Sequence, residues 1–212
     1  MNDLSWSKVV LVEGVSGIGK STLIATLLRQ YIRQNKALRT LLHLTQAHTY
    51  GPLAPDEDDI SLTVEQNISH LQSICSMLSW CIQSLRDEKK PKFYCIIDTL
   101  HITHCFRPGR VSWSDVMGID QELASLKVKL IFLKANKESV WERGIWRRRD
   151  EQFITQYAQK FGNSLEEIFM YFIEEQAGME EVMKKSMMDK LILNVDTPIN
   201  SYARKAYDFW MC

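Results

Sequence analysis

A glycine-rich segment between an apolar run and an amphipathic stretch constrains the fold of this chain more than any other feature. Gly14, Gly19, Lys20 and Ser21 stand in the order G-x-x-x-x-G-K-S, and the run before them, Val9 to Val12, is rich in β-branched residues. After the segment, apolar residues recur at helical spacing: Leu23, Ile24, Leu27 and Leu28. A strand, a glycine loop and a helix in this order predict a phosphate-binding loop.

The chemistry of this loop follows from its glycines. Because glycine tolerates positive φ, the loop can turn its backbone N–H groups inward, next to the positive end of the following helix. We expect Lys20 to reach the β- and γ-phosphates of a nucleotide and the Ser21 hydroxyl to bind its Mg²⁺. A glycine-rich turn with a solvated lysine is the alternative, and the flanking strand and helix disfavour it. The expected nucleotide-binding residues are Gly14, Gly17, Ile18, Gly19, Lys20, Ser21 and Thr22.

Length and charge narrow the class of protein. A chain of 212 residues suits a single α/β domain over residues 1–212. Lys plus Arg and Asp plus Glu both count 26, so no overall basic field favours a nucleic acid or a membrane as partner. Apolar runs are strand-sized, the N-terminus has no signal-peptide pattern and the five cysteines form no C-x-x-C pair. We therefore expect a soluble, cytoplasmic protein with reduced thiols.

Strand-sized apolar runs alternate with helical segments along the whole chain. The expected strands are residues 9–12, 39–44, 93–97, 128–133 and 190–195. The expected helices run from the glycine loop to about 35, from 61 or 63 to about 87, from 112 or 114 to about 126, from 137 or 138 onward, from 163 to 185, and from after 198 to about 210. This alternation predicts an α/β fold, a five-stranded parallel sheet with helices on both faces.

An acid directly follows the third expected strand. Asp98 closes the apolar run of residues 93–97, at the sheet edge where ligands of such folds bind. A carboxylate there can organise Mg²⁺ together with Ser21, or it can accept the proton of an attacking hydroxyl. We expect Asp98 to be catalytic and leave these two roles open.

The segment after the second expected strand contains polar and aromatic residues. Residues 45–59 combine two prolines, a glycine and an acidic cluster, so they predict a loop. Because this loop leaves the carboxyl end of a strand, His48, Thr49 and Tyr50 are candidate substrate contacts. A solvated surface loop is the alternative.

The densest polar cluster follows the third expected strand. It contains His101, His104, Arg107 and Arg110. Two histidines three residues apart could bind zinc, but neither a third ligand nor an H-E-x-x-H pattern is evident. An acceptor site is the better interpretation, since an arginine such as Arg107 can hold a phosphate or carboxylate with two hydrogen bonds. Structural histidines and a surface arginine are the alternative.

Four arginines crowd the helix expected after the fourth strand. Arg143, Arg147, Arg148 and Arg149 fall within seven positions. Arginines that close over a γ-phosphate offset charge on the transferring oxygens, so we expect a lid at about residues 142–152 with Arg143 and Arg147 as catalytic residues. A solvated, ion-paired helix face is the alternative.

The pattern resembles the P-loop nucleoside and nucleotide kinases, and thymidylate kinases most closely. The resemblance covers nearly the whole chain and rests on VEGVSGIGKST at the loop, Asp98, the arginine-bearing segment Glu142–Asp150 and LILNVDT before the last helix. It implies ATP and Mg²⁺ as cofactors, a lid over the phosphates, and Asp196 and Thr197 beside the adenine. It also implies transfer of the γ-phosphoryl group to a small acceptor, a nucleoside monophosphate first. A homodimer is kept as a possible assembly.

The departures from that family lie in the acceptor half. Ser16 stands where thymidylate kinases have an acidic residue in the loop, so we count Ser16 as a substrate contact of different chemistry. Residues 45–47 are Thr-Gln-Ala instead of an Arg-Glu-Pro type sequence, and Asp98 is followed by Thr99 instead of arginine.

Other nucleotide-binding classes can be compared residue by residue. A GTPase would place glycine three positions after Asp98, where this chain has His101, and its N-K-x-D motif would end in Asp where Asn136 and Lys137 lead to Ser139. Both GTPase tests fail. Two alternatives to a nucleotide kinase stay open: a kinase of a non-nucleotide hydroxyl metabolite or antibiotic, and a regulatory ATP-binding or ATPase module.

Overall fold

A five-stranded parallel sheet runs through the computed structural model, which describes residues 7–35, 41–49, 63–84, 93–106, 111–148, 162 and 164–212. The strand order is β2-β3-β1-β4-β5 and every pair is parallel. The strands are β1 (Ser7–Glu13), β2 (Leu41–Leu44), β3 (Phe93–Asp98), β4 (Lys129–Lys134) and β5 (Asp189–Asn194). The predicted fold class is therefore confirmed, with strand ends shifted by one or two residues.

The three inner strands are buried on both faces because helices cover each side of the sheet. All residues of β3 are buried, as are all but one of β1. The register pairs Val12 with Asp98 and Glu13 with Phe132, so β1, β3 and β4 end together at one edge. Residues that follow these strands meet at that carboxyl edge.

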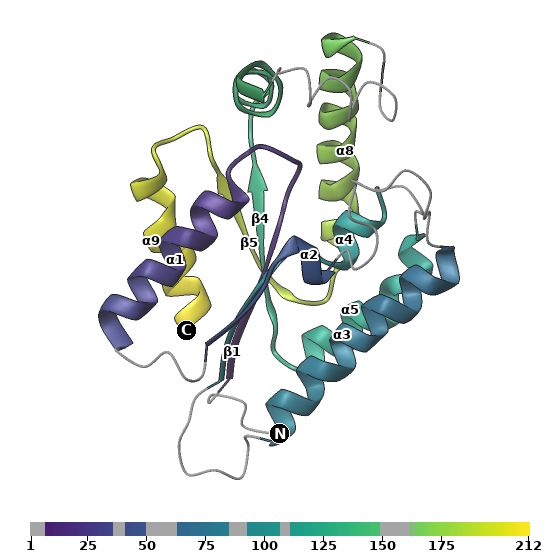
Figure 1. Ribbon diagram of the computed structural model, residues 1–212, viewed down its shortest axis with the longest axis vertical. Coiled ribbons are helices and arrows are strands. Elements are labelled where there is room, and N and C mark those ends of the chain that lie inside the picture. The colour runs from purple at the N-terminus through teal and green to yellow at the C-terminus, as the bar shows by residue number, and fades with distance from the viewer. Residues whose placement is uncertain are drawn as a thin grey trace.

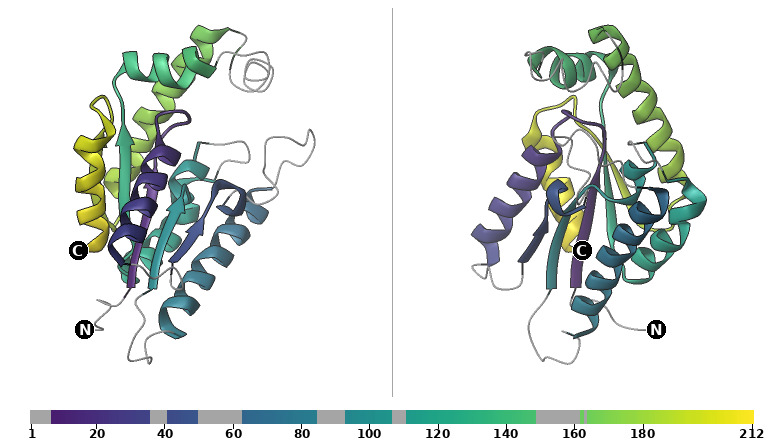
Figure 2. Two further views of the ribbon diagram at one scale, coloured as in Figure 1. Left: turned by 60° about the vertical axis from the view of Figure 1, so that its left-hand side comes forward. Right: turned by 45° about the vertical axis from the view of Figure 1, so that its right-hand side comes forward.

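The helices form a layer on each side of the sheet (Figures 1 and 2). On one side lie α1 (Lys20–Asn35) and α9 (Ile199–Met211), and on the other lie α3 (Val64–Ser84), α5 (Trp113–Ser125) and α8 (Leu165–Lys185). On the first side, Tyr31 of α1 contacts Tyr94 of β3 and Trp210 of α9, with ring centroids 4.7 and 5.7 Å away. These rings join the two helices to the sheet.

Three helices begin at side chains that cap their free N–H groups. The Ser112 and Asp115 side chains each accept a hydrogen bond from the other residue's backbone at the start of α5. Thr63 and Gln66 do the same at the start of α3, and a third reciprocal cap opens α8. Of the alternative helix starts in the sequence, Thr63 and Ser112 are therefore confirmed.

The structure contains two short helices that the sequence analysis did not predict. The helix α2 (Gln46–Thr49) lies within the expected loop after β2, and α4 (His101–His104) follows β3. Both are four residues long, too short for a periodic pattern to reveal them.

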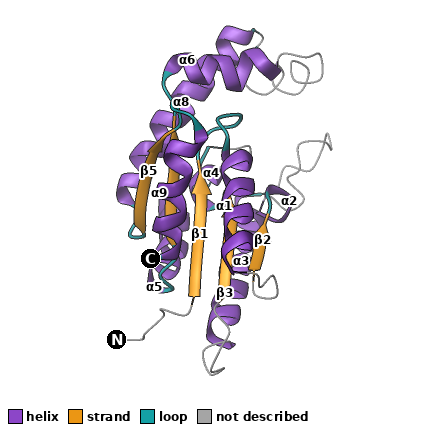
Figure 3. Cartoon of the chain, turned by 90° about the vertical axis from the view of Figure 1, so that its left-hand side faces the viewer, coloured by secondary structure: helices purple, strands orange, loops and turns teal. Residues whose placement is uncertain are grey.

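The helix expected after β4 is present, but it is not a regular α-helix. One turn, α6 (Lys137–Ser139), leads into the π-helix η2 (Val140–Ile145) and the 3-10 turn η3 (Trp146–Arg148). Figure 3 shows this segment above the carboxyl edge of the sheet. A π turn brings residues five apart close together, and here Arg147 Nε lies 3.1 Å from Glu142 Oε1. Within the described part of the chain, no helix is long and apolar enough to cross a membrane.

Candidate functional site

The phosphate-binding loop joins β1 to α1 and requires glycine where its backbone turns. Gly14, Gly17 and Gly19 all have positive φ, at 144°, 83° and 112°. A Cβ atom at Gly14 would lie 2.9 Å from the Leu133 carbonyl oxygen of β4. The loop therefore packs closely on the sheet, and only glycine fits at Gly14. These features agree with the prediction of a phosphate-binding loop.

The loop lysine lies beneath the loop instead of in solvent. Lys20 is 5% exposed, and its Nζ donates to the carbonyl oxygens of Gly14 and Val15 at 2.7 and 3.0 Å. Ser21 and Thr22 are exposed in the first turn of α1. The Ile18 side chain is fully buried, so any contact of this residue with a nucleotide comes from its backbone.

Asp98 ends β3 as a buried carboxylate with free hydrogen-bonding capacity. Its side chain is 6% exposed, and Oδ1 has no hydrogen-bond partner among the described residues. Burial raises the pKa of Asp98, while the charges of Lys20 and His43 act in the opposite direction. An acceptor atom buried in this way fits a ligand that donates a hydrogen bond or a cation.

Backbone strain directly follows this acid. Thr99 has a φ of 62°, which is unfavourable for a β-branched residue. Its backbone N–H donates to Val12 at 3.0 Å and its hydroxyl to the Asp98 carbonyl at 2.6 Å. A second hydroxyl, that of Thr49 in α2, donates to the same carbonyl at 3.1 Å. These bonds fix the backbone of Asp98, and such strained backbone clusters at functional sites.

A hollow of about 430 Å³ lies between the first turns of α1 and the end of β3. It lies between α1 and the carboxyl end of β2, and its lining residues are Ser21, Ile24, Ala25, Leu28, His43, Thr45, Gln46, Ala47 and Asp98. The structure thus brings the two residues predicted to organise Mg²⁺ into one cavity. A carboxylate and a hydroxyl fit Mg²⁺, which prefers oxygen ligands. Among the described residues, His, Cys, Asp and Glu side chains form no group of three that could hold a metal ion such as zinc.

The residues predicted after β2 differ in their placement. His48 is exposed, and its Nδ1 accepts a hydrogen bond from the Thr45 backbone at 3.2 Å. Thr49 is fully buried beneath Asp98 and holds it through the bond described above. Tyr50 and Arg107, two predicted acceptor contacts, lie outside the described residues.

His101 and His104 are not acceptor contacts in this structure, which corrects the interpretation from the sequence. Both side chains are fully buried on α4. His101 Nε2 lies 3.1 Å from Asp120 Oδ1, so it carries the proton of that bond, and His104 Nδ1 lies 2.6 Å from Asn67 Oδ1. His101 Nδ1 has no hydrogen-bond partner among the described residues, but both side chains are inaccessible and bonded to α5 and α3. On these bonds we assign both histidines a structural role.

A buried acid in the last position of β1 completes this region, and the sequence analysis missed it. Glu13 is fully buried and accepts hydrogen bonds from the Leu100 backbone, at 2.9 Å, and from the Thr103 hydroxyl. Burial raises its pKa, and these bonds and the nearby charge of His101 only partly offset that effect. Glu13 therefore fixes the start of the segment after Asp98. The sequence contains one sign of this role: Glu13 stands between the apolar strand and Gly14, where a buried carboxylate needs hydrogen-bond partners.

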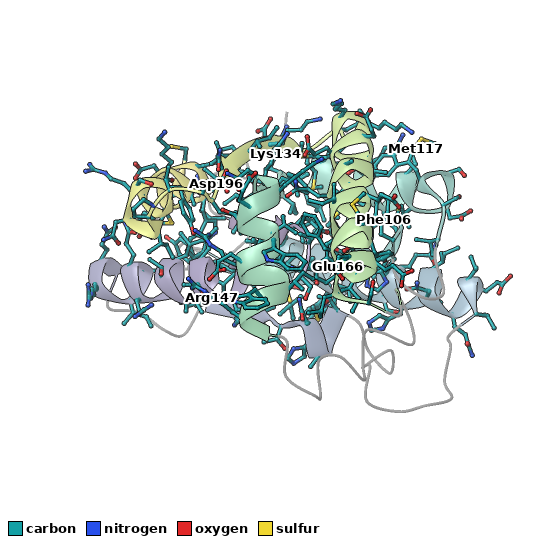
Figure 4. The ribbon with its side chains drawn as sticks, turned by 90° about the horizontal axis from the view of Figure 1, so that it is seen from above. Phe106, Met117, Lys134, Arg147, Glu166 and Asp196 are labelled. Carbon is teal, nitrogen blue, oxygen red and sulfur yellow. The ribbon has the colours of Figure 1, made fainter. Side chains whose placement is uncertain are left out.

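The two predicted lid arginines have partners outside the phosphate-binding loop. Arg143 donates to the Val195 carbonyl at 2.7 Å, and Arg147 is 67% exposed and paired with Glu142. Figure 4 shows Arg147 at one end of the helical segment after β4, and Lys134 and Asp196 at its other end. The remainder of the predicted lid, from residue 149 onward, lies outside the described residues.

The same segment contacts the loop and the turn before α9. A Cβ atom built on Gly144 would lie 3.4 Å from the Ser16 carbonyl oxygen, so the π-helix packs directly on the phosphate-binding loop. The Asp196 carboxylate accepts a hydrogen bond from the Asn136 backbone at 3.0 Å, and Thr197 is exposed beside it. The predicted adenine-binding turn is thus held against the base of the predicted lid.

The chain is similar to known proteins in its structure and not in its sequence. No protein-family model matches the chain, and no curated protein matches its sequence. Among solved structures it is similar to the YorR protein of Bacillus subtilis in complex with phosphorylated GDP, with a TM-score of 0.57 and 13% identity over 95% of this chain and 94% of that one. It is also similar to thymidylate kinase from Ehrlichia chaffeensis, with a TM-score of 0.57 and 13% identity over 97% and 99% of the two chains. The resemblance to thymidylate kinases that the sequence predicted is confirmed at the level of the fold.

Proposed function

We propose that this protein is a kinase that moves the γ-phosphoryl group of Mg·ATP to a small acceptor of the nucleotide class. The observation that carries the proposal is the loop at the end of β1, where positive-φ glycines turn before Lys20 and Ser21. A buried carboxylate on the adjacent strand shares a hollow with Ser21. A loop, a lysine, a hydroxyl and an acid in this arrangement are the components that phosphoryl transfer uses.

In the proposed reaction, the residues of this chain position groups and stabilise charge. The loop amides and Lys20 hold the β- and γ-phosphates, for which Lys20 exchanges its carbonyl partners for phosphate oxygens. Ser21 and Asp98 would hold Mg²⁺, which would supply positive charge to the transferring phosphate oxygens. The acceptor oxygen forms a bond to the γ-phosphorus as the bond to the β,γ-bridging oxygen breaks, and ADP leaves with that electron pair.

The arginines after β4 supply positive charge from above the loop. Gly144 already touches the loop at Ser16, so Arg143 and Arg147 flank the point of contact in the sequence. We propose that Arg147 exchanges Glu142 for the transferring phosphoryl group, and that Arg143 acts beside the turn at Asp196, where the base of ATP binds. Arginine donors that bind the transferring oxygens act mainly on the transition state.

A nucleoside monophosphate is the first candidate for the acceptor. The support is the fold shared with a thymidylate kinase and with a protein bound to phosphorylated GDP. A hydroxyl-bearing acceptor is the second candidate, because Asp98 Oδ1, which has no partner in the described part of the chain, is suited to accept a hydroxyl proton. In either case Asp98 lies beside the reacting oxygen.

The test is ADP formation by the purified protein with Mg·ATP and a panel of deoxynucleosides and their 5′-monophosphates. We expect acceptor-dependent turnover, and Lys20→Ala should lower it by several powers of ten, since the lysine contacts the transferring group. Lys184→Ala, which removes an exposed lysine of α8, is the matched control and should keep full activity. ADP formation that no acceptor changes would favour the regulatory ATPase alternative.

A further inference from the structure

The hollow beside the phosphate-binding loop has an apolar wall and a polar end. Ile24, Ala25 and Leu28 of α1 form the apolar wall, one helical turn along from Ser21. The polar end comes from the carboxyl ends of β2 and β3, where His43 and Asp98 lie. A cavity of about 430 Å³ with such a lining is the size and kind that holds a small organic molecule.

Two residues that line this hollow each have one buried polar atom without a hydrogen-bond partner among the described residues. His43 Nε2 and Asp98 Oδ1 are both inaccessible to solvent, and neither has a hydrogen-bond partner among the described residues. Buried polar atoms are nearly always paired, so an unpaired one calls for a specific reason. Here the two residues come from neighbouring strands and line one cavity, although these two atoms are covered in the structure. A ligand in the hollow would satisfy them once the His43 ring and the Asp98 carboxylate turn toward it.

We propose that His43 is a specificity-determining residue for the acceptor, to which its Nε2 makes a hydrogen bond inside this hollow. The inference rests on the proposed function and deepens it. Asp98 lies beside the reacting oxygen at the loop side of the cavity, and His43 contacts a part of the acceptor that does not react. The sequence gives no sign of this role, since His43 stands within a short strand.

The lining also defines the chemistry of the part that His43 recognises. The wall of Ile24, Ala25 and Leu28 suits an uncharged, flat ring, because removal of its apolar surface from water is favourable. The Asp98 carboxylate disfavours a further anionic group on the part of the acceptor that does not react. His43 therefore meets a neutral hydrogen-bonding group at the edge of a ring, as a nucleobase presents.

The experiment compares wild-type protein with His43→Leu, His43→Gln and His70→Leu. His70 of α3 is the matched control, because it lies outside the hollow and its Nε2 contacts the His48 and Thr49 carbonyls. Steady-state kinetics use the best acceptor of the panel of deoxynucleosides and their 5′-monophosphates. His43→Leu should raise the acceptor KM about tenfold or more and leave the ATP KM within about twofold, since the contact binds only the acceptor.

A conservative variant and a binding measurement separate recognition from folding. Glutamine can place an amide group near the position of the imidazole Nε2, so His43→Gln should recover part of the lost acceptor affinity. In a protein with isotope-labelled histidines, the NMR signal of the His43 ring should shift when the same acceptor is added without ATP. This second measurement does not depend on whether His43→Leu folds.

The outcomes distinguish the two proposals. Acceptor-dependent turnover with an unchanged acceptor KM in a folded His43→Leu, or a His43 signal that the acceptor leaves in place, overturns the role of His43 and leaves the kinase proposal intact. Absence of turnover with every acceptor of the panel rejects the proposed function, and the role of His43 falls with it.

Discussion

Replacement of Asp120 tests whether the polar cluster after β3 is structural. The Asp120 side chain is 1% exposed. Its Oδ1 lies 3.1 Å from His101 Nε2 and accepts from the Ser186 hydroxyl at 2.7 Å, while Oδ2 accepts from the Met187 N–H at 2.7 Å. One carboxylate thereby joins α4, α5 and the segment after α8. Asp120→Asn keeps the shape but removes the charge and turns an N–H donor toward one of these partners.

The expected loss of stability is large for a single isosteric change. Removal of one partner from a buried charged network costs about 3–5 kcal/mol. For a chain of this length, each kcal/mol corresponds to about 2–4 °C in melting temperature, so Asp120→Asn should lower it by roughly 6–20 °C. Asp208→Asn is the control: Asp208 is exposed on α9, with Arg204 3.8 Å away, and exposed pairs contribute about 0–1 kcal/mol.

The dependence of this loss on pH gives an independent test. Burial raises the pKa of Asp120, but hydrogen bonds from His101, Met187 and Ser186 outweigh burial and hold the pKa below its usual value. A lowered folded-state pKa contributes stability above the unfolded pKa of about 3.9, and that contribution is lost as the pH falls toward the folded value. The free energies of unfolding of wild type and Asp120→Asn, measured with urea, should therefore converge below about pH 4. If the free energies of unfolding of the two proteins differ by less than about 1 kcal/mol at pH 7, the structural role of Asp120 is refuted.

Substitutions at three further positions test the loop and the segment above it. Gly14→Ala places a Cβ atom 2.9 Å from the Leu133 carbonyl at a φ of 144°, so it should destabilise the fold by about 1–3 kcal/mol and weaken ATP binding, measurable by thermal unfolding and titration calorimetry. In Gly144→Ala the new Cβ atom lies 3.4 Å from the Ser16 carbonyl oxygen, an ordinary contact, so this variant should keep activity. The larger side chain of Gly144→Val should raise the ATP KM. Equal activity of the two variants would contradict this packing. Arg147→Ala should lower kcat more than it raises the ATP KM, because a charge that meets the transferring group acts on the transition state, and an equal effect on both would indicate ordinary substrate binding.

Local patterns in the sequence were sufficient to predict the framework of the fold. The glycine loop between an apolar strand and a helix specifies β1, the loop and α1, because each part has a short-range signal. Hydrophobic runs located the other strands within one or two residues, and Thr63 and Ser112 marked helix starts through their capping partners. The position of Asp98 at the end of β3 was predicted because the end of an apolar strand is visible in the sequence.

Burial and long-range partners decided what the sequence could not predict. His101 and His104 lie beside arginines in the sequence, yet Asp120 and Asn67, far along the chain, hold them inside the protein. His43 gave no signal, because a four-residue strand is too short to reveal which face is buried. The π-helix packs on the loop at Gly144, a contact that only the folded chain brings about.

Transfer of label from γ-labelled ATP tests the central claim most directly. With Mg²⁺, wild-type protein and the panel of deoxynucleosides and their 5′-monophosphates, we predict that label appears in a phosphorylated acceptor, with one ADP formed for each labelled product. Lys20→Ala should abolish this transfer while Lys184→Ala retains it. Release of label only as inorganic phosphate, at a rate that no acceptor changes, would contradict the account.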